Sequence, residues 1–427
     1  MSGTPATATR QKPRVLVLSR IYPNNVTTTL GLWVRSQVRE SAQFCEPKVI
    51  APVPYCPPIP GLPENYARFR RVEPRRSDRG IESFHPRFFT GPALATHPIE
   101  WLLYELAVGR TVAALHREFP FDLIHAHFTY PDGVVAARLA RRFGVPFVIT
   151  EHNLWGPWMN EYPGVVRRTI RAARECACHI AVSEAARDRI EQFAGHLKCA
   201  VVIPVGVDGL EFTLSESRAS IDADRILFVG AVRPIKGVDI LIRALRLLVD
   251  RGRSTSLTIV GEPFYGTYQK EERRLKALVD QLGLAGRVQF VGKKLPPELT
   301  RYMQESAVLV LPSRAESLGL VLVESLACGT PVVATRCGGP EDIVDDQVGV
   351  LVAPEDPEAL ARGIEQVIDQ RDRYDPALLR RRALERFGIE VVGRRLRDVY
   401  ENVIGQHQRV VRDSPNSAEP LMAPSTD

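Results

Sequence analysis

Short apolar runs rich in β-branched residues alternate with longer stretches in which apolar positions recur every three or four residues. The short runs predict strands, and the longer stretches predict amphipathic helices. In the first half of the chain the predicted strands are residues 14–19, 47–53, 121–126, 146–150, 178–182 and 200–204. Helices are predicted between most of them, for example over 98–117, 131–143 and 183–194. Such alternation is typical of βαβ units, so we expect an α/β fold with a doubly wound parallel sheet.

The alternation restarts after a polar stretch, residues 213–224, which we interpret as a linker. Strands are predicted at 225–230, 256–260, 287–291, 307–311, 331–335 and 348–352. Helices are predicted at 238–250, 268–282, 296–305, 319–328, 356–369 and 389–404. We therefore expect two Rossmann-like domains facing a central cleft, because ligands of such sheets bind beyond the carboxyl ends of the strands. The expected division of the chain is a disordered N-terminus 1–13, domains 14–207 and 208–383, a C-terminal helix 384–405 and a disordered tail 406–427.

The composition is that of a globular protein, with 44% hydrophobic and 25% charged residues. No apolar run approaches the roughly 18 residues that span a bilayer. The polar start of the chain lacks the apolar segment of a signal peptide. We therefore expect a cytoplasmic protein in which the seven scattered cysteines are free thiols.

The net charge of +6 and the pI near 9.0 suit an anionic ligand without requiring nucleic acid. Basic residues are most concentrated in "RFRRVEPRRSDR", residues 68–79, which contains six arginines. Its proline and its polar residues predict a loop. Two interpretations stay open: a solvated loop, or a loop that contacts an anionic acceptor or lipid headgroups. No RNA-binding motif or aromatic platform accompanies it, so we exclude nucleic acid as a partner.

Two carboxylates lie eight positions apart, one before and one within a nearly unbroken apolar run, in "SRAESLGLVLVESLACGTP", residues 313–331. Glu316 precedes the run, in a predicted strand-to-helix loop, whereas Glu324 lies within it. A carboxylate in an apolar wall needs hydrogen-bond donors, because an unpaired buried charge costs several kcal/mol. A ribose diol offers two hydroxyl donors, and an arginine of the same domain is the alternative partner of Glu324. The helix that starts near Gly319 also points backbone N–H groups at the cleft, which favours a phosphate there.

A second candidate segment is "ILFVGAVRPIKGVDILIRAL", residues 226–245. Its predicted strand ends at Gly230, and Arg233 and Lys236 precede a helix that begins at Gly237. A departing diphosphate needs fixed positive charge where negative charge develops. We expect Lys236 and Arg233 to supply it, and the alternative is a pair of solvent-exposed loop cations.

Histidines gather at the ends of two neighbouring predicted strands in the first half of the chain. "FDLIHAHFTYPDG" contains His125 and His127, and "ITEHN" contains Glu151 and His152. A metal cluster is one interpretation, but no thiolate or carboxylate has the spacing of a ligand set. His125 can instead be a core histidine whose hydrogen bonds are satisfied by the backbone.

The segment "ESLGLVLVESLACGTPVVAT", followed by "CGGPEDIV", resembles the E-x7-E signature of retaining glycosyltransferases of family 4, which have the GT-B fold. The resemblance covers roughly residues 14–404. It implies two Rossmann-like domains around a deep cleft and a C-terminal helix that can cross back to the first domain. It also implies transfer of a hexosyl group from a nucleotide-sugar, UDP- or GDP-linked, to an acceptor with retention of the anomeric configuration.

By this resemblance, Glu324 binds the nucleotide ribose and Glu316 approaches the transferred sugar. Lys236 stabilises the departing diphosphate. Arg233 stands in for the arginine that usually follows the first glycine, where this chain has Ala231. The other expected donor contacts come from glycines and from the start of the helix after Glu316, namely Gly31, Gly230, Gly292, Leu318, Gly319 and Leu320.

The resemblance also assigns the N-terminal residues. His127 contacts the donor sugar near its reacting carbon, so it joins the expected catalytic group. His152 matches a histidine of the acceptor side, next to Glu151. Gly31 opens the helix after a glycine-bearing loop that lies over the sugar diphosphate.

No cofactor is expected besides the donor substrate. Asp222 and Asp224 have the D-x-D form of a metal-binding motif, but they precede their predicted strand inside the linker, so we expect metal-independent transfer. The resemblance favours a polysaccharide or lipid-linked acceptor over a small molecule, with peripheral contact at the inner membrane surface. Two alternatives stay open: a nucleotide-sugar epimerase of the same fold, and a non-catalytic nucleotide-sugar-binding protein, which Ala231 would suit.

Overall fold

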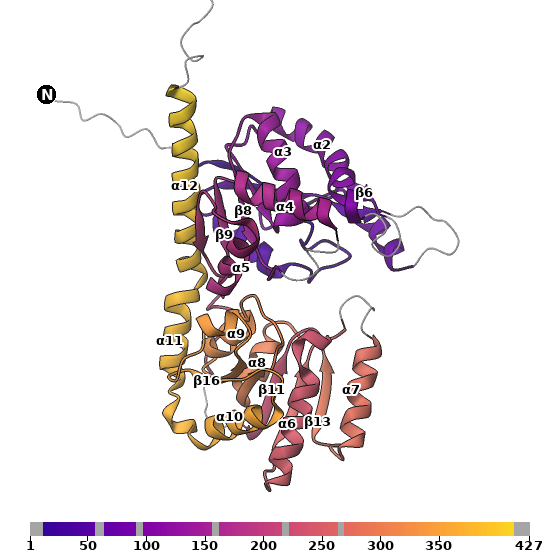
Figure 1. The fold of residues 1–427 in the computed structure, drawn as a ribbon, viewed down its shortest axis with the longest axis vertical. Coiled ribbons are helices and arrows are strands. Elements are labelled where there is room, and N and C mark those ends of the chain that lie inside the picture. The colour runs from indigo at the N-terminus through magenta and orange to yellow at the C-terminus, as the bar shows by residue number, and fades with distance from the viewer. Residues whose placement is uncertain are drawn as a thin grey trace, which may run out of the picture.

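The protein consists of two α/β domains, each built on its own sheet (Figure 1). The computed structural model describes residues 12–55, 64–90, 97–155, 162–215, 222–263 and 269–413. Strands and helices alternate through both domains, so the doubly wound architecture predicted from the hydrophobic pattern is confirmed.

The N-terminal domain contains an eight-stranded sheet in the order β10-β9-β8-β7-β1-β2-β5-β4. Its strands are β1 (Arg14–Leu18), β2 (Glu46–Ile50), β4 (Arg75–Asp78), β5 (Ile81–Phe84), β7 (Leu123–His127), β8 (Phe147–Glu151), β9 (Cys178–Ala181) and β10 (Ala200–Val202). Neighbouring strands are parallel except β4, which is antiparallel to β5. Two short strands, β3 (Val53–Tyr55) and β6 (Arg87–Phe89), form a second small sheet.

Helices cover both faces of the eight-stranded sheet. The helices of this domain are α1 (Leu32–Ser41), α2 (Glu100–Glu118), α3 (Val134–Phe143), α4 (Pro163–Glu175) and α5 (Glu184–Ala194). Side chains of β1 alternate between two cores, as strand geometry requires. Leu16 and Leu18 pack with α2, α3 and α4, whereas Val15 and Val17 pack with α1.

The C-terminal domain contains a six-stranded parallel sheet in the order β13-β12-β11-β14-β15-β16. Its strands are β11 (Asp222–Val229), β12 (Ser256–Val260), β13 (Val288–Gly292), β14 (Ser306–Leu311), β15 (Val332–Thr335) and β16 (Gly349–Val352). Its helices are α6 (Val238–Asp250), α7 (Gln269–Gln281), α8 (Glu298–Gln304), α9 (Leu320–Ala327), α10 (Pro357–Asp369) and α11 (Pro376–Phe387). Helices α6 and α10 pack against each other, as do α9 and α11.

Each large sheet has a point at which the strand order reverses. In the C-terminal domain the chain runs outward from β11 to β13 and then places β14 on the other side of β11. In the N-terminal domain β7 lies beside β1 in the same way. Ligands of open α/β sheets bind at such switch points, beyond the carboxyl ends of the strands. The loops after β1, β7, β11 and β14 therefore mark where a site is expected.

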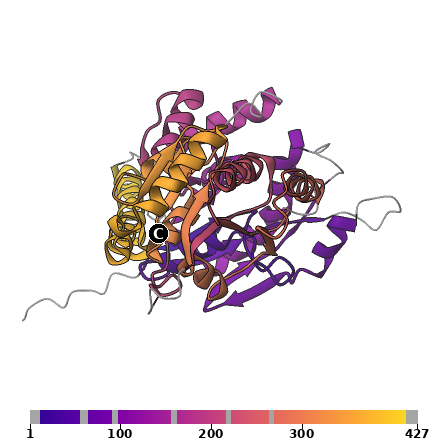
Figure 2. The same ribbon diagram turned by 90° about the horizontal axis from the view of Figure 1, so that it is seen from below.

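The last helix, α12 (Ile389–Asp413), joins the two domains along one side of the molecule (Figure 1 and Figure 2). Its Tyr400 hydroxyl lies 2.6 Å from Nδ1 of His125, and both side chains are buried in the N-terminal domain. Where the chain passes from one domain to the other, the Val207 N–H donates to the Phe387 carbonyl at 2.8 Å. The two segments that link the domains therefore run side by side. Neither α12 nor any other described helix is long and apolar enough to cross a membrane.

Several boundaries differ from the sequence-based expectation. The C-terminal helix begins at Ile389 and not at residue 384, because residues 384–387 are the last turn of α11. Part of the 68–79 segment is β4 rather than a loop, because β5 supplies antiparallel backbone partners. The polar linker ends early, since β11 already begins at Asp222. Disorder predicted from residue 406 is wrong for 406–413, which continue α12, because extending an existing helix costs far less than starting one. The remaining predicted disorder lies outside the described residues, apart from 12 and 13.

The prediction that all seven cysteines are free thiols is wrong for one pair. Cys178 and Cys199 form a disulfide between β9 and the residue before β10. The register that pairs His179 with Ala200 places these two cysteines opposite each other. Strand order is a tertiary property, so their spacing along the chain could not reveal this. The other cysteines that the structure describes are free: Cys45, Cys176, Cys328 and Cys337.

Gly237→Ala is expected to destabilise the fold by about 3 kcal/mol or more. Gly237 has a φ of +65°, and a Cβ there would lie 2.0 Å from the Pro312 carbonyl oxygen. This clash can be relieved only if the loops after β11 and β14 separate. Gly144→Ala is the matched control, because its φ is +67° but no atom would lie within 4 Å of the new Cβ. This variant should lower the free energy of unfolding by only about 1 kcal/mol, which is the cost of placing a residue with a Cβ in the left-handed region. Equal losses in urea unfolding would contradict the packing argument.

Candidate functional site

A lysine and a carboxylate meet at the switch point of the C-terminal sheet. Lys236 ends the 3-10 turn Pro234–Lys236 that precedes α6, and Glu316 lies in the loop between β14 and α9. The Lys236 ammonium donates a hydrogen bond to Oε2 of Glu316 and forms an ion pair with it. Ser313 Oγ donates to the same oxygen at 3.2 Å. The side chains of the pair are 23% and 11% exposed, so a fixed cation and its carboxylate lie at the edge of the sheet.

Backbone contacts hold the Glu316 loop in place. The Glu316 N–H donates to the Cys337 carbonyl at 3.1 Å, and the Gly339 N–H donates to the Glu316 carbonyl at 2.8 Å. A Cβ at Gly339 would lie 2.3 Å from the Cα of Leu318, so this close approach requires glycine. The Leu318 side chain packs in the core, which leaves only its backbone for the expected donor contact. Gly319, with a φ of +86°, then starts α9 at Leu320.

Glu324 lies on α9 with a half-buried side chain. No hydrogen bond or ion pair joins its carboxylate to another described residue. The arginine partner that the sequence left open is therefore not found in the described part of the chain. Burial raises the pKa of Glu324 to about 7, and the nearby Glu211 adds to the effect. An acceptor-only carboxylate of this kind suits a ligand that brings its own hydroxyl donors.

Lowering the pH from 8 to 6 is expected to weaken nucleotide binding about tenfold. The pKa of Glu324 lies near 7, so the ionised form prevails above pH 7, and each unit below it removes about nine-tenths of that form. Isothermal titration with a nucleoside diphosphate measures the effect. In Glu324→Gln, nucleotide binding should be weak at both pH values. Any pH dependence that remains should come only from titration of the ligand phosphate. An unchanged pH dependence in this variant would contradict the role of Glu324.

Other predicted donor contacts lie along the same edge of the C-terminal sheet. Gly230 follows β11, and half-buried Arg233 precedes the Lys236 turn. Gly292 ends β13 with a φ of +71°, and no atom would lie within 4 Å of a Cβ there. The next residue, Lys293, donates a hydrogen bond to Oγ1 of Thr29 in the N-terminal domain. The loop after β1 therefore reaches the carboxyl edge of the other sheet.

His127 ends β7 and has no exposed surface. Its Nδ1 lies 2.9 Å from Nε2 of His152, and the planes of the two rings are 12° apart with 5.3 Å between their centroids. Its own Nε2 is buried and has no hydrogen-bond partner among the residues that the structure describes. Burial lowers the pKa of both histidines, to about 3 for His152, so both are neutral at physiological pH. A buried polar atom without a partner is costly, and a sugar hydroxyl could satisfy Nε2 only after local opening.

Two residues near the His127–His152 pair, His125 and Glu151, have hydrogen-bond partners within the protein. His125 is a core histidine, as one interpretation of the sequence allowed, although its partners are side chains: Tyr400 at 2.6 Å and Thr150 Oγ1 at 2.7 Å. The Glu151 carboxylate accepts three hydrogen bonds at 3.0 Å, from the backbone N–H groups of Thr129 and Asn153 and from the indole of Trp155. Glu151 is 3% exposed, so it shapes the loop that carries His152 and presents no open face to an acceptor.

Gly31 is required by its own loop. Its φ is +72°, and a Cβ would lie 2.3 Å from the Ile21 carbonyl oxygen. Gly31 also precedes α1 at Leu32. The close approach is to Ile21, so the glycine is explained without the phosphate contact that the resemblance implied.

Sequence reasoning missed a buried acidic network behind the loops after β1 and β7. Oδ1 of Asp132 accepts hydrogen bonds from the Arg20 N–H and the Tyr104 hydroxyl, both at 2.7 Å. The Arg20 guanidinium also pairs with Glu100. Burial raises the pKa of Asp132 to about 7, although Arg20 opposes this. The Pro-Asp-Gly turn was the only local signal, because Glu100 and Tyr104 come from the distant helix α2.

The candidate site has two halves, the histidine loop of the N-terminal domain and the Glu316 loop of the C-terminal domain. These two half-sites touch across the domain boundary. The Glu184 N–H, at the start of α5, donates to Oδ2 of Asp342 at 2.7 Å. Gly338 forms a backbone bridge with Glu316, and a Cβ there would lie 3.3 Å from Leu154, two residues after His152. The histidine loop of the N-terminal domain and the carboxylate loop of the C-terminal domain are therefore neighbours.

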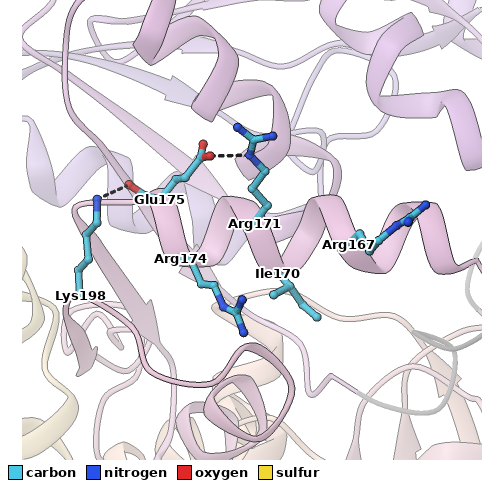
Figure 3. Close-up of a pocket in the computed structure, with 6 residues that line it drawn as sticks. All are labelled: Arg167, Ile170, Arg171, Arg174, Glu175 and Lys198. Atoms are coloured by element: carbon cyan, nitrogen blue, oxygen red, sulfur yellow. Dashed lines mark hydrogen bonds and ion pairs between the residues drawn. The ribbon is translucent and has the colours of Figure 1, made fainter.

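Two other features lie apart from this site. Asp222 and Asp224 begin β11, at the strand end opposite Lys236, and Asp224 accepts a hydrogen bond from Ser254 at 2.9 Å. Among the described residues no group of three His, Cys, Asp or Glu side chains is arranged to hold a metal ion. A solvent-open hollow of about 520 Å³ lies on α4, and none of the predicted site residues lines it (Figure 3).

Family models match both domains. Residues 46–209 match the family described as Glycosyltransferase Family 4, and residues 214–383 match Glycosyl transferases group 1. A D-inositol 3-phosphate glycosyltransferase of Frankia alni is 33% identical over 301 residues, which are 63% of this chain and 71% of the relative. The enzyme of the same name from Acidothermus cellulolyticus is 33% identical over 64% of this chain, and the match spans 65% of its length, just under two thirds.

Solved structures show the same fold. Sucrose-phosphate synthase from Thermosynechococcus elongatus superposes with a TM-score of 0.76 at 20% identity, covering 92% of this chain and all of that chain. Anabaena Alr3699/HepE in complex with UDP-glucose superposes with a TM-score of 0.70 at 21% identity, covering 91% of this chain and 99% of that chain. The two sheets and their helices are therefore arranged as in these two solved structures.

Proposed function

Because this chain belongs to glycosyltransferase family 4, we propose that it transfers a hexosyl group from a UDP- or GDP-sugar to an acceptor with retention of the anomeric configuration. The acceptor that we propose is a polysaccharide or lipid-linked glycan, used by a cytoplasmic enzyme. The proposal includes no cofactor and no metal.

The observation that carries this proposal is the pairing of Lys236 with Glu316 at the switch point between β11 and β14. The two residues are 80 positions apart in the chain, yet the sheet brings them together at the edge where ligands bind. Glu324, on the helix that follows Glu316, has no donor among the described residues and suits a ribose diol. Together they match a ligand with a diphosphate, a sugar and a ribose.

In the proposed reaction the bond between the anomeric carbon and the diphosphate oxygen breaks, and its electron pair stays with the diphosphate. Lys236 and Arg233 stabilise the charge that develops there. The acceptor hydroxyl forms the new bond on the same face, and its proton passes to the leaving phosphate oxygen. Glu316 and His127 hold the sugar while the anomeric carbon is positively charged.

A thermal-shift panel of UDP, GDP, ADP and their sugar conjugates, each with EDTA or magnesium, tests the proposal. A ligand at a hundred times its dissociation constant should stabilise the fold by about 2.7 kcal/mol. The sugar nucleotide that binds is then incubated with membrane glycolipid extract, and the anomeric configuration of the product is read by NMR. The expected result is a glycoside with the configuration of the donor.

Other outcomes would refute the proposal. Conversion of the sugar nucleotide to an isomer without an acceptor would indicate an epimerase. Binding without turnover would indicate a non-catalytic protein. Stabilisation that disappears in EDTA would overturn the metal-independent part, and an inverted product would overturn retention.

A further inference from the structure

Arg314 links the two loops that carry Lys236 and Glu316. It lies between β14 and α9, two residues before Glu316. Its backbone N–H donates to the Ile235 carbonyl at 2.8 Å, and its guanidinium donates to the Pro234 carbonyl. Pro234 and Ile235 directly precede Lys236 in the 3-10 turn. Arg314 therefore holds the lysine turn against the loop of its carboxylate partner.

Two carboxylates hold the Arg314 guanidinium in turn. Asp239, in the first turn of α6, accepts from Nη1 at 3.0 Å and from Nη2 at 3.1 Å. Glu355, in the loop after β16, accepts from Nε and, at 3.3 Å, from Nη2. The φ of Glu355 is +60°, a left-handed backbone that costs a residue with a Cβ about 1 kcal/mol. Such a conformation persists where surrounding contacts fix it, and Arg314 supplies one of these contacts.

All five N–H groups of the Arg314 guanidinium have partners within the protein. A guanidinium has one donor on Nε and two on each terminal nitrogen. Nε donates to Glu355, Nη1 to the Pro234 carbonyl and to Asp239, and Nη2 to Asp239 and to Glu355. No N–H group of this guanidinium is left for a ligand phosphate, and two carboxylates balance its charge. We call these contacts, together with the backbone bond to Ile235, the Arg314 clamp.

The ion pair of Arg314 with Asp239 is mostly shielded from water. The side chain of Asp239 is 16% exposed, and that of Arg314 is 29% exposed. Burial alone would raise the pKa of Asp239, but the hydrogen bonds and the charge of Arg314 lower it below its ordinary value. Arg274, 3.5 Å from the same carboxylate, adds to this effect. Both partners are therefore charged at physiological pH, and their bidentate contact fixes geometry as well as charge.

We infer that Arg314 is a positioning residue, which sets where Lys236 and Glu316 lie relative to each other without touching the substrate. This inference rests on the proposed function, in which Lys236 stabilises the departing diphosphate. Fixed charge lowers the barrier only where negative charge develops, and a small displacement of such a group costs much of the rate. Motif spacing gave no sign of Arg314, because Asp239 and Glu355 are 75 and 41 positions away.

Replacement of Arg314 by methionine tests this role. Arg314→Met should lower kcat roughly thirtyfold and nucleoside diphosphate affinity less than about threefold, because the Lys236 ammonium is kept but displaced. Steady-state kinetics and calorimetry measure the two effects. Arg251→Met is the matched control: Arg251, directly after α6, is 32% exposed and pairs with Glu358 and Glu365 of α10. The control loses comparable ion pairs away from the site, so its kcat should stay within about twofold of wild type.

Arg314→Lys separates positioning from charge. Lysine keeps the positive charge, but it cannot form the bidentate contact with Asp239. Because the clamp depends on that contact, kcat should stay at least about tenfold below wild type. Asp239→Ala should also lower kcat. Its combination with Arg314→Met should lower kcat less than about twofold further, since both substitutions remove the same contact.

Hydrogen exchange read by mass spectrometry tests the clamp without any substrate. The backbone N–H of residue 314 is bonded to the Ile235 carbonyl. In Arg314→Met it should exchange at least about tenfold faster than in wild type, because the two loops separate more often. In Arg251→Met it should exchange at the wild-type rate. Urea unfolding of each variant shows that the fold is intact.

Four results would overturn the inference: wild-type kcat in Arg314→Met, equal losses of kcat in Arg314→Met and Arg251→Met, wild-type kcat in Arg314→Lys, or unchanged exchange at residue 314. Faster exchange at residue 314 in a protein that binds and transfers no sugar nucleotide would refute the proposed function and leave the clamp standing. Sugar transfer that is unaffected by Arg314→Met would do the reverse.

Discussion

Lys236→Ala is expected to lower kcat by roughly a hundredfold or more, with a smaller loss of nucleotide affinity. The lysine provides the ammonium that pairs with Glu316 at the switch point. Its charge matters most when the diphosphate departs, because negative charge grows there in the transition state. Removal also leaves the Glu316 carboxylate without its ion-pair partner in a mostly buried place. Steady-state kinetics with the donor identified by thermal shift measures the effect.

The control for this variant is Lys48→Ala in the N-terminal domain. Lys48 is 24% exposed and pairs with Glu82 at 2.8 Å, so the substitution removes a comparable ion pair away from the site. Its kcat should stay within about threefold of wild type. Lys236→Arg, which keeps the charge, should recover part of the rate. A Lys236→Ala enzyme with wild-type kcat would remove the main support for the proposed function.

His127→Ala is expected to lower kcat by roughly a hundredfold or more while nucleotide affinity stays within about twofold. The reason is the buried Nε2 of His127, which has no hydrogen-bond partner in the described part of the chain and lies next to the boundary at which the two half-sites meet. Local opening would let that nitrogen contact the sugar only in the productive complex. Under the proposed function, the nucleotide alone is bound by the other domain. Calorimetry with the nucleoside diphosphate and turnover with the full donor separate the two effects.

Loss of a buried histidine also destabilises the fold, so His85→Ala serves as the control. His85 is 2% exposed, and burial lowers its pKa as it does for His127. Its ring nitrogens contact the Ala51 carbonyl and Ser83, after β2 and in β5, on the side of β1 away from β7. This variant should lose stability and keep kcat per folded molecule. Wild-type turnover in His127→Ala would show that the N-terminal site assignment is wrong.

The order of strands and helices could be predicted from sequence because hydrophobic spacing reports backbone periodicity directly. Residues 256–260 and 238–250, for example, match β12 and α6. The two carboxylates around the start of α9 were also predictable, since local spacing alone places Glu316 in a loop and Glu324 on a helix. Each of these conclusions depends only on residues close together in the chain.

The contacts that complete the site depend on strand order instead. The pairing of Lys236 with Glu316 exists because β11 lies beside β14, and the network of Arg20, Glu100 and Asp132 exists because α2 packs against two distant loops. Hydrophobic spacing shows that a face is buried but not what buries it.

The sequence by itself therefore determined the α/β class, the two domains and the residues at the strand ends, because these follow from local periodicity and motif spacing. Only the tertiary structure decided the partners: His125 with Tyr400, 275 positions apart, Glu151 with its own loop, and Arg314 with Asp239. The physical reason is that these contacts form only when the sheets assemble and the helices pack. That step brings together side chains from distant parts of the chain.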